Sequence, residues 1–180
     1  AQNTASGYQA LYSNTTGASN TATGYDALGS NTTGGNNTAS GLSALRSNTT
    51  GGSNSAFGYR SLENNTTGTQ NTASGYQALF SNITGSYNTA SGYRALYINT
   101  GNTNVAVGVS ALKLNTIGQY NTAVGQQALQ DNTTAINNSA LGWRALFQNT
   151  TGAENTSIGA DSLFSNTTGI NNTAIGHKAL

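Results

Sequence analysis

One 17-residue pattern of apolar and polar positions recurs along the whole chain. Each unit is close to Asn-Thr-Ala-x-Gly-Tyr-x-Ala-Leu-x-x-Asn-Thr-Thr-Gly-x-x, and we number these positions 1 to 17. One unit is shorter by a single residue, because a Thr is missing at Asn99-Thr100-Gly101. Ten units and half of an eleventh fill residues 1–180, which indicates a single repeat array without a separate domain or linker. The units begin at Asn3, Asn20, Asn37, Asn54, Asn71, Asn88, Asn104, Asn121, Asn138, Asn155 and Asn172.

The unit length and its residue types predict strands and not helices. The smallest common helical repeat is about 33 residues, and Thr, Asn, Ser and Gly disfavour a helix interior. We therefore expect an all-β fold, a parallel β-solenoid (β-roll) of ten 17-residue coils. Stacking at about 4.8 Å per coil would give an array roughly 50 Å long. We expect one short strand at positions 2–4 and a second around positions 7–10, although the spacing of Tyr at 6 and Leu at 9 also fits a tight corner.

Columns that do not vary between units predict the interior of the stack. Leu at position 9 is the expected main interior side chain, and Ala or Ser at positions 3 and 8 leaves room for neighbouring backbone. The structural core is Leu11, Leu28, Leu45, Leu62, Leu79, Leu96, Leu112, Leu129, Leu146 and Leu163. Gly at position 5 indicates a positive φ or a close backbone approach. These turn glycines are Gly7, Gly24, Gly41, Gly58, Gly75, Gly92, Gly108, Gly125, Gly142 and Gly159.

The Asn-Thr-Thr-Gly segment of each unit is a predicted turn. Gly at position 15 closes it, and only Ala135 replaces that Gly. Asn side chains stacked at position 12 can hydrogen-bond their equivalents one coil away. This Asn ladder consists of Asn14, Asn31, Asn48, Asn65, Asn82, Asn99, Asn115, Asn132, Asn149 and Asn166. The Asn-Thr-Thr triplets also match the N-glycosylation acceptor, but we favour turn residues.

Two Ala and one Leu per unit make a thin interior, so we expect a second face to be buried. Side chains at positions 2, 4 and 6 would share that face. Position 4 is Ser or Thr where position 6 is Tyr in several early units, and it becomes aliphatic later, as expected for a shared volume. The candidate inter-chain face is Tyr8, Tyr25, Tyr76, Tyr93, Val107, Val124, Leu141 and Ile158. The polar residues at position 7 and the mixed residues at position 10 are expected to face water.

Composition narrows the class of protein. Only 6% of residues are charged, against about 25% in a typical domain, and the net charge is +1. No basic field is present to hold nucleic acid or an anionic membrane. The regular aromatic positions argue against disorder, and the absence of Cys excludes a disulfide scaffold. No signal peptide or long apolar segment occurs, and because the chain starts and stops within a repeat we expect a fragment or a processed subunit.

Candidate chemistry is sparse. The five acidic residues lie in variable columns and form neither a carboxylate pair nor a Ca²⁺ loop, and His177 occupies a column that holds Tyr elsewhere. We therefore expect no catalytic residue, no metal site and no cofactor, and predict that the chain is not an enzyme. The aromatic residues of position 10 offer, at most, stacking surfaces for a glycan.

The segments Asn121–Gly125 and Asn172–Gly176, followed by x-Ala-Leu, resemble the head repeats of trimeric autotransporter adhesins (YadA-like heads). Longer units of this kind are similar to repeat regions of bacterial surface proteins and phage tail-fibre proteins. The resemblance covers every unit, although the period, the Asn-Thr-Thr-Gly loop and the early Ser at position 4 depart from the pattern. It implies a left-handed β-roll, three chains side by side and an adhesive or fibre role outside the cell.

These observations predict a non-enzymatic structural or adhesive fibre segment, extracellular, at a cell surface or on a virion fibre. The expected partners are copies of the same chain, as a homotrimer or an end-to-end filament, with a surface receptor or glycan as a further candidate. No nucleic acid and no membrane are expected within this segment. A self-assembling filament subunit is one alternative, since no capping unit is evident. The other is ice binding by ranks of Thr such as Thr21 and Thr23, which Phe57 interrupts.

Overall fold

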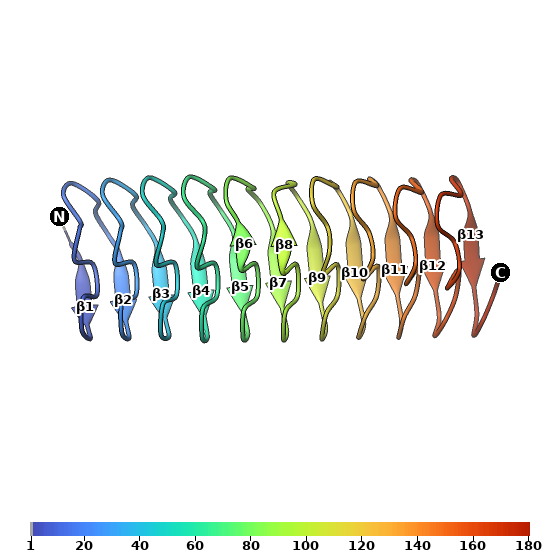
Figure 1. Ribbon diagram of the computed structural model, residues 1–180, viewed down its shortest axis with the longest axis horizontal. Coiled ribbons are helices and arrows are strands. Elements are labelled where there is room, and N and C mark those ends of the chain that lie inside the picture. Colours follow the sequence, from blue (N-terminus) through green and yellow to red (C-terminus); the bar gives the residue numbers. More distant parts are fainter. Residues whose placement is uncertain (1) are drawn as a thin grey trace.

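The computed structural model describes residues 2–180 as a single stack of coils with no helix, so the all-β parallel solenoid predicted from the sequence is confirmed. Figure 1 shows the coils following one another along the long axis, with the two ends of the chain at opposite ends of the stack. Eleven strands form one parallel sheet, one strand per unit. They are β1 (Thr4–Ser6), β2 (Thr21–Thr23), β3 (Thr38–Ser40), β4 (Ser55–Phe57), β5 (Thr72–Ser74), β7 (Thr89–Ser91), β9 (Val105–Val107), β10 (Thr122–Val124), β11 (Ser139–Leu141), β12 (Thr156–Ile158) and β13 (Thr173–Ile175).

Each strand occupies positions 2–4 and pairs with the same positions of the next coil. Thr4, for example, lies opposite Thr21, and this register continues through the shortened unit, where Thr89 lies opposite Val105. Because the register never shifts, each column of the sequence becomes a column in space. The Ala at position 3 therefore always points to the interior, while positions 2 and 4 point outward.

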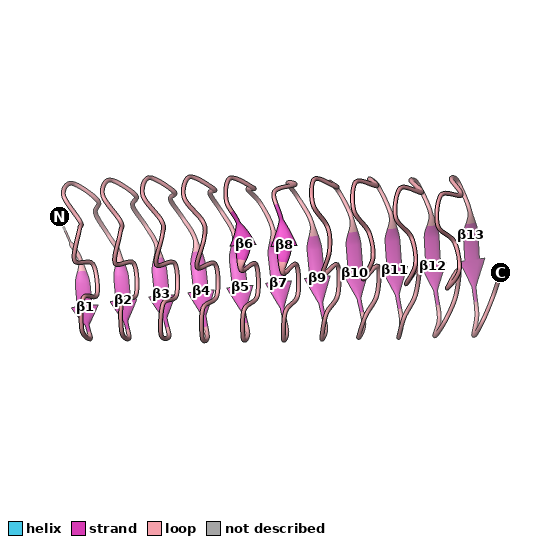
Figure 2. Cartoon of the chain, viewed as in Figure 1, coloured by secondary structure: helices cyan, strands magenta, loops and turns pink. Residues whose placement is uncertain are grey.

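The second strand expected around positions 7–10 is wrong. Positions 6–11 form turns, with φ of 52–60° at position 7 and 49–55° at the ten Leu from Leu11 to Leu163. An extended strand is incompatible with a left-handed backbone at two of four residues. Within residues 2–180, extended pairing outside the main sheet occurs only between β6 (Ser81–Asn82) and β8 (Ile98–Asn99), at positions 11 and 12 (Figure 2).

Backbone hydrogen bonds join successive coils even where no strand is present. The amide of Leu28 donates to the Ala44 carbonyl at 3.0 Å, and that of Thr32 donates to the Thr49 carbonyl at 2.9 Å. The amide of Asn36 points the other way, to the Ala18 carbonyl of the preceding coil at 2.9 Å. The whole circumference of the coil therefore contributes to stacking, although most coils have only three residues in a regular strand.

The core is a narrow apolar column surrounded by amides. Ala at positions 3 and 8 and Leu at position 9 are almost all fully buried in the inner coils, and they form one continuous cluster. The largest fully buried side chains other than Leu are Asn. The interior thus combines one apolar column with a polar lining.

Candidate functional site

The position 12 asparagines stack as a column of side-chain amides. Asn48 donates from Nδ2 to Asn31 Oδ1 at 2.8 Å and to the Gly51 carbonyl at 2.9 Å. Asn65 repeats the contact with Asn48 at 2.8 Å. The column also passes through the shortened unit, where Asn99 donates to Asn82 at 3.0 Å.

A second asparagine column lies at position 1, where the sequence pattern served only to mark the start of each unit. The backbone amide of Asn37 donates to Asn20 Oδ1 at 2.9 Å, and Asn37 Nδ2 donates to the Gly51 carbonyl at 2.9 Å. Both columns therefore converge on the carbonyl of the position 15 residue. Within residues 2–180, no buried side-chain nitrogen or oxygen lacks a hydrogen-bond partner. The constancy of Asn at position 1 was the signal for this second column.

The glycines of positions 5 and 15 are required for different reasons. At position 5 the φ values are 118–140°, and a Cβ on Gly75 would lie 2.6 Å from the Gly92 carbonyl oxygen. At position 15 the φ is ordinary, but a Cβ on Gly51 would lie 2.4 Å from Asn48 Oδ1. Where Ala135 occupies position 15, the bond from Asn132 Nδ2 to its carbonyl lengthens to 3.3 Å. A Cβ on Gly51 would also lie 2.4 Å from the Gly68 carbonyl oxygen of the next coil. The asparagine column and the neighbouring backbone together thus favour Gly at this position.

The Leu column carries an unusual backbone that the sequence analysis missed. A Leu with φ near 50° is rare, and the same conformation is far worse for residues branched at Cβ. Position 9 holds only Leu, and position 7, also left-handed, never holds Val, Ile or Thr. The absence of β-branched residues from two columns, in a chain rich in Thr, was the available signal.

The outward face of the main sheet changes character along the stack. In β1–β3, β5 and β7 position 4 is Ser or Thr, whereas in β9–β13 it is aliphatic and in register, from Val107 to Ile175. Leu141 is 50% exposed and Ile158 is 38% exposed, while Val124 is half-buried. The residues of the candidate inter-chain face therefore lie on the surface of the single chain, where a partner can reach them.

The Tyr side chains of position 6 lie beyond the glycine turn and stack on one another. Ring centroids are 5.1 Å apart for Tyr8 and Tyr25, and 5.3 Å apart for Tyr76 and Tyr93. At position 10, Phe147 and its equivalent in the next coil stack at 5.2 Å. Within residues 2–180 each stack holds two or three rings, and Tyr76 alone has a ring on both faces. The end rings keep one face without a ring neighbour.

Position 7 lies between these aromatic columns, and the expectation that it faces water is wrong for several units. Ser43, Gln77 and Asp161 are buried. Position 10 is likewise not uniformly solvated, because Glu63 is buried. Gln77, Asp161 and Glu63 are each paired with an arginine, which lets them leave water without losing a partner. Within residues 2–180 the structure shows no such partner for the Ser43 side chain.

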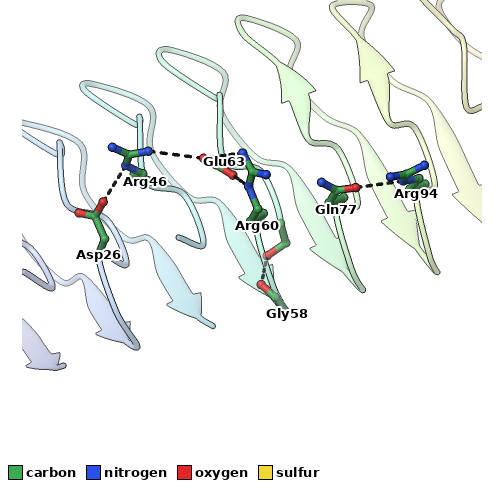
Figure 3. Close-up of polar contacts among 8 residues, drawn as sticks. Asp26, Arg46, Gly58, Arg60, Glu63, Gln77 and Arg94 are labelled. Carbon is green, nitrogen blue, oxygen red and sulfur yellow. Dashed lines mark hydrogen bonds and ion pairs between the residues drawn. The ribbon is translucent and has the colours of Figure 1, made fainter. Parts of the chain in front are cut away.

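Ion pairs and amide contacts link the side chains of positions 7 and 10, as Figure 3 shows. Arg46 bridges Asp26 at 2.6 Å and Glu63 at 3.7 Å, and Arg60 also contacts Glu63. The hydrogen bond that Arg60 donates to the Glu63 carboxylate raises the pKa of the guanidinium above its ordinary value. Arg60 is therefore charged at any physiological pH.

Further along the stack, Arg144 makes the most complete pair. It donates from Nε and Nη2 to the two oxygens of Asp161 at 2.8 and 2.9 Å. Its guanidinium carbon lies 3.8 Å from the Trp143 ring and 4.8 Å from the Phe164 ring. A planar cation held between two rings and a carboxylate is a stable arrangement for arginine.

Ionisable groups do not converge elsewhere. Across residues 2–180 there is no group of three His, Cys, Asp or Glu that could hold a metal ion, and His177 is exposed. No helix in the same region is long and apolar enough to cross a membrane. The asparagines of the Asn-Thr-Thr triplets, such as Asn31 and Asn48, are fully buried in the inner coils, so the folded chain does not expose them for glycosylation.

The fold and its surfaces define a parallel β-solenoid with amide-lined coils. Models of protein families, curated proteins and solved structures show no match to this chain. The function of the chain is therefore inferred from the contacts and surfaces that its repeated positions form.

Proposed function

We propose that the chain is a non-enzymatic segment of an extracellular fibre, with a structural or adhesive role, and that it packs side by side with copies of itself. One observation carries the proposal: an in-register column of aliphatic side chains, all exposed except the half-buried Val124, follows the outward face of β9–β13. Contiguous apolar surface of this kind marks an interaction site. A second copy of a repeat array matches such a column best, because it offers the same spacing along its whole length.

The interior supports a passive role. Its polar atoms are engaged in contacts between coils, as in Asn37 and Asn48, and within residues 2–180 they leave no buried side-chain group unpaired. Each coil is fixed to the next around its full circumference. These properties suit a stiff rod that presents repeated surfaces.

Burial of the outward face would contribute to association. Full burial of an aliphatic side chain contributes about 1.5–3 kcal/mol, so residues that are roughly half exposed contribute about 0.5–1.5 kcal/mol each. Val107, Leu141, Ile158 and Ile175 from each copy would together supply several kcal/mol. Tyr stacks on neighbouring coils extend the surface toward the first half of the chain.

Light scattering coupled to size-exclusion chromatography tests the proposal. We expect a mass that is a multiple of the 18.3 kDa chain, with three copies as the leading expectation. The double variant Leu141→Asp, Ile158→Asp should give a folded 18.3 kDa monomer. Ile136→Asp is the matched control, because Ile136 is 41% exposed but lies in the loop after β10. A folded monomer of the unaltered chain at high concentration would overturn side-by-side packing, and electron microscopy would identify end-to-end filaments.

Ice binding is a second candidate, favoured by the first half of the same face. Position 2 holds Thr in β1, β2, β3, β5 and β7, in register, and their hydroxyls form no hydrogen bond to other groups within residues 2–180. Regularly spaced hydroxyls on a sheet face can order water, although Phe57 breaks the position 4 rank in β4. Thermal hysteresis measured on the purified chain decides: no effect at millimolar protein removes this candidate.

A further inference from the structure

The arginines at position 7 differ in one respect that points to a ligand. Arg60 and Arg144 each contact a carboxylate, and so does Arg46 at position 10. Arg94 has only a neutral partner, because its Nε donates to Gln77 Oε1 at 2.9 Å (Figure 3). Within residues 2–180 its two terminal nitrogens donate to no protein group, and no carboxylate lies within 4.0 Å of it.

Arg94 nevertheless has three neighbours that orient its guanidinium, namely two aromatic rings and one amide. Its guanidinium carbon lies 5.2 Å from the Tyr93 ring centroid and 5.2 Å from the Tyr97 ring centroid. With Gln77 holding Nε, the rings and the amide fix the plane of the guanidinium. The unused edge of the fork is therefore oriented before anything binds, and this lowers the entropic cost of binding an anion.

The chain itself shows which group fits such a fork. Three coils further on, Arg144 reaches the following coil, where Phe164 lies beside its guanidinium and Asp161 at position 7 supplies both carboxylate oxygens. The following coil offers Arg94 only Ser110 at position 7, and Arg94 turns the other way, to Gln77 of the preceding coil. A carboxylate from outside would bind the two terminal nitrogens that Gln77 leaves free.

A second unpaired cation lies next to this fork. Lys113 occupies position 10 of the coil after Tyr97, and the Ile98 amide joins these two coils through the Lys113 carbonyl at 3.0 Å. No carboxylate of residues 2–180 lies within 4.0 Å of Lys113. Lys113 at position 10 and Arg94 at position 7 of the preceding coil have the same relation as Arg46 and Asp26, which are in contact. Two uncompensated positive charges thus occupy adjacent coils of a chain whose net charge is only +1.

We propose that Arg94 and Lys113, with Gln77 and Ser110, form a binding site for the carboxylate or sulfate group of an acidic polysaccharide. The inference rests on the proposed adhesive function, to which it adds a ligand class. Bidentate arginine recognises planar carboxylate, and the surrounding amide and hydroxyl groups match sugar hydroxyls. Tyr93 and Tyr97 are the last rings of their stacks, so each has one face without a ring neighbour, and such a face suits stacking on a sugar ring.

Calorimetric titration with an oligogalacturonate, an acidic sugar, tests the site on the intact chain. We expect binding that weakens as salt rises, and no binding of a neutral chito-oligosaccharide. Ser110→Asp should supply a carboxylate on the coil after Arg94, at the position from which Asp161 pairs with Arg144, and so compete with the ligand for the guanidinium and lower the affinity at least tenfold without loss of fold. Arg94→Lys, which keeps the charge but removes the fork, should also lower it at least tenfold.

The controls separate this site from the wider proposal. Arg144→Gln should leave oligogalacturonate binding unchanged, because that fork is already occupied by Asp161. Absence of binding, or an unchanged affinity in Ser110→Asp, overturns the site, and so does equal binding of a poly-glutamate peptide, which would indicate unselective anion binding. Light scattering on the same samples reports self-association independently, so loss of the site leaves side-by-side packing standing.

Discussion

Replacing Asn82 by alanine removes one side-chain amide from the middle of the position 12 column. In the folded chain Asn82 Nδ2 donates to Asn65 Oδ1 at 2.9 Å and to the Gly85 carbonyl at 2.8 Å. Its Oδ1 accepts from Asn99 Nδ2 at 3.0 Å. Asn82→Ala therefore leaves Asn65 Oδ1 without a donor and Asn99 Nδ2 without one of its two acceptors, both in a buried region.

The expected cost follows from these two groups. A buried polar group that loses its partner costs about 1–3 kcal/mol, so the free energy of unfolding should fall by about 2–5 kcal/mol. Thr84→Ala is the matched control, because Thr84 lies in the same coil but is exposed and makes no side-chain hydrogen bond within residues 2–180. A surface change of that kind should alter stability by less than about 0.5 kcal/mol.

Urea unfolding followed by circular dichroism and by Trp143 fluorescence measures the effect. Two probes are needed because a repeat array can unfold in parts, and the single Trp reports on the second half of the stack. If Asn82→Ala unfolds at the same urea concentration as Thr84→Ala, the asparagine columns do not hold the coils together and the reasoning fails.

An isosteric change adds a pH test at the same position. Asn82→Asp replaces a donor with an acceptor that faces the Gly85 carbonyl and Asn65 Oδ1, so burial and these acceptors raise the pKa of the introduced carboxyl. A raised folded-state pKa means that the stability present below about pH 4, near the ordinary Asp value, is lost as the pH rises. The variant should therefore be markedly less stable at pH 7 than at pH 3.5, relative to the unaltered chain. Equal relative stability at both pH values would contradict a buried, acceptor-lined site.

Three further predictions concern the backbone. Gly75→Ala should cost more than about 3 kcal/mol or prevent folding, since the φ of Gly75 is +135° and the added Cβ would meet the next coil. Gly52→Ala, where the φ is ordinary and the nearest contact is 3.1 Å, should be far milder, and thermal melts compare the two variants. Leu79→Ile should cost about 1–3 kcal/mol by urea unfolding although its volume is unchanged, because the φ of 51° penalises β-branching, while Leu79→Met should cost less. Insertion of a Thr after Thr100, which restores the common loop, should change stability by less than about 1 kcal/mol, since Asn99 and its column already bridge this coil; a large loss would show that the short loop is required.

The period and the constant columns were sufficient to predict the solenoid. In a parallel, in-register stack every residue lies above its equivalent, so repetition in the sequence maps directly onto contacts in space. The strand at positions 2–4 was predictable for the same reason, because Ala at position 3 must point inward between two outward residues. The asparagine at position 12 carried its own chemistry, since a side chain with both a donor and an acceptor can pair with copies of itself.

What the pattern did not reveal depends on backbone conformation and on pairing between coils. The turn through positions 6–11 needs left-handed residues at positions 7 and 9, and neither is Gly, so the usual marker of such a turn was missing. The burial of Gln77 and Asp161 could not be foreseen from a polar column, because it depends on arginines that reach across from other coils. Position 1 was treated as a boundary, although its backbone amide and side chain form a second column.

Small-angle X-ray scattering from the intact chain tests the central claim most directly, namely that a rigid stack of coils packs beside copies of itself. At about 4.8 Å per coil the longest dimension should be about 50 Å, with a scattering mass that is a whole multiple, greater than one, of 18.3 kDa. Side-by-side packing thickens the particle and leaves its length unchanged. The profile of a disordered chain, or a compact particle much shorter than the stack, would contradict the fold. A particle of the expected length with the mass of a single chain would contradict its self-association.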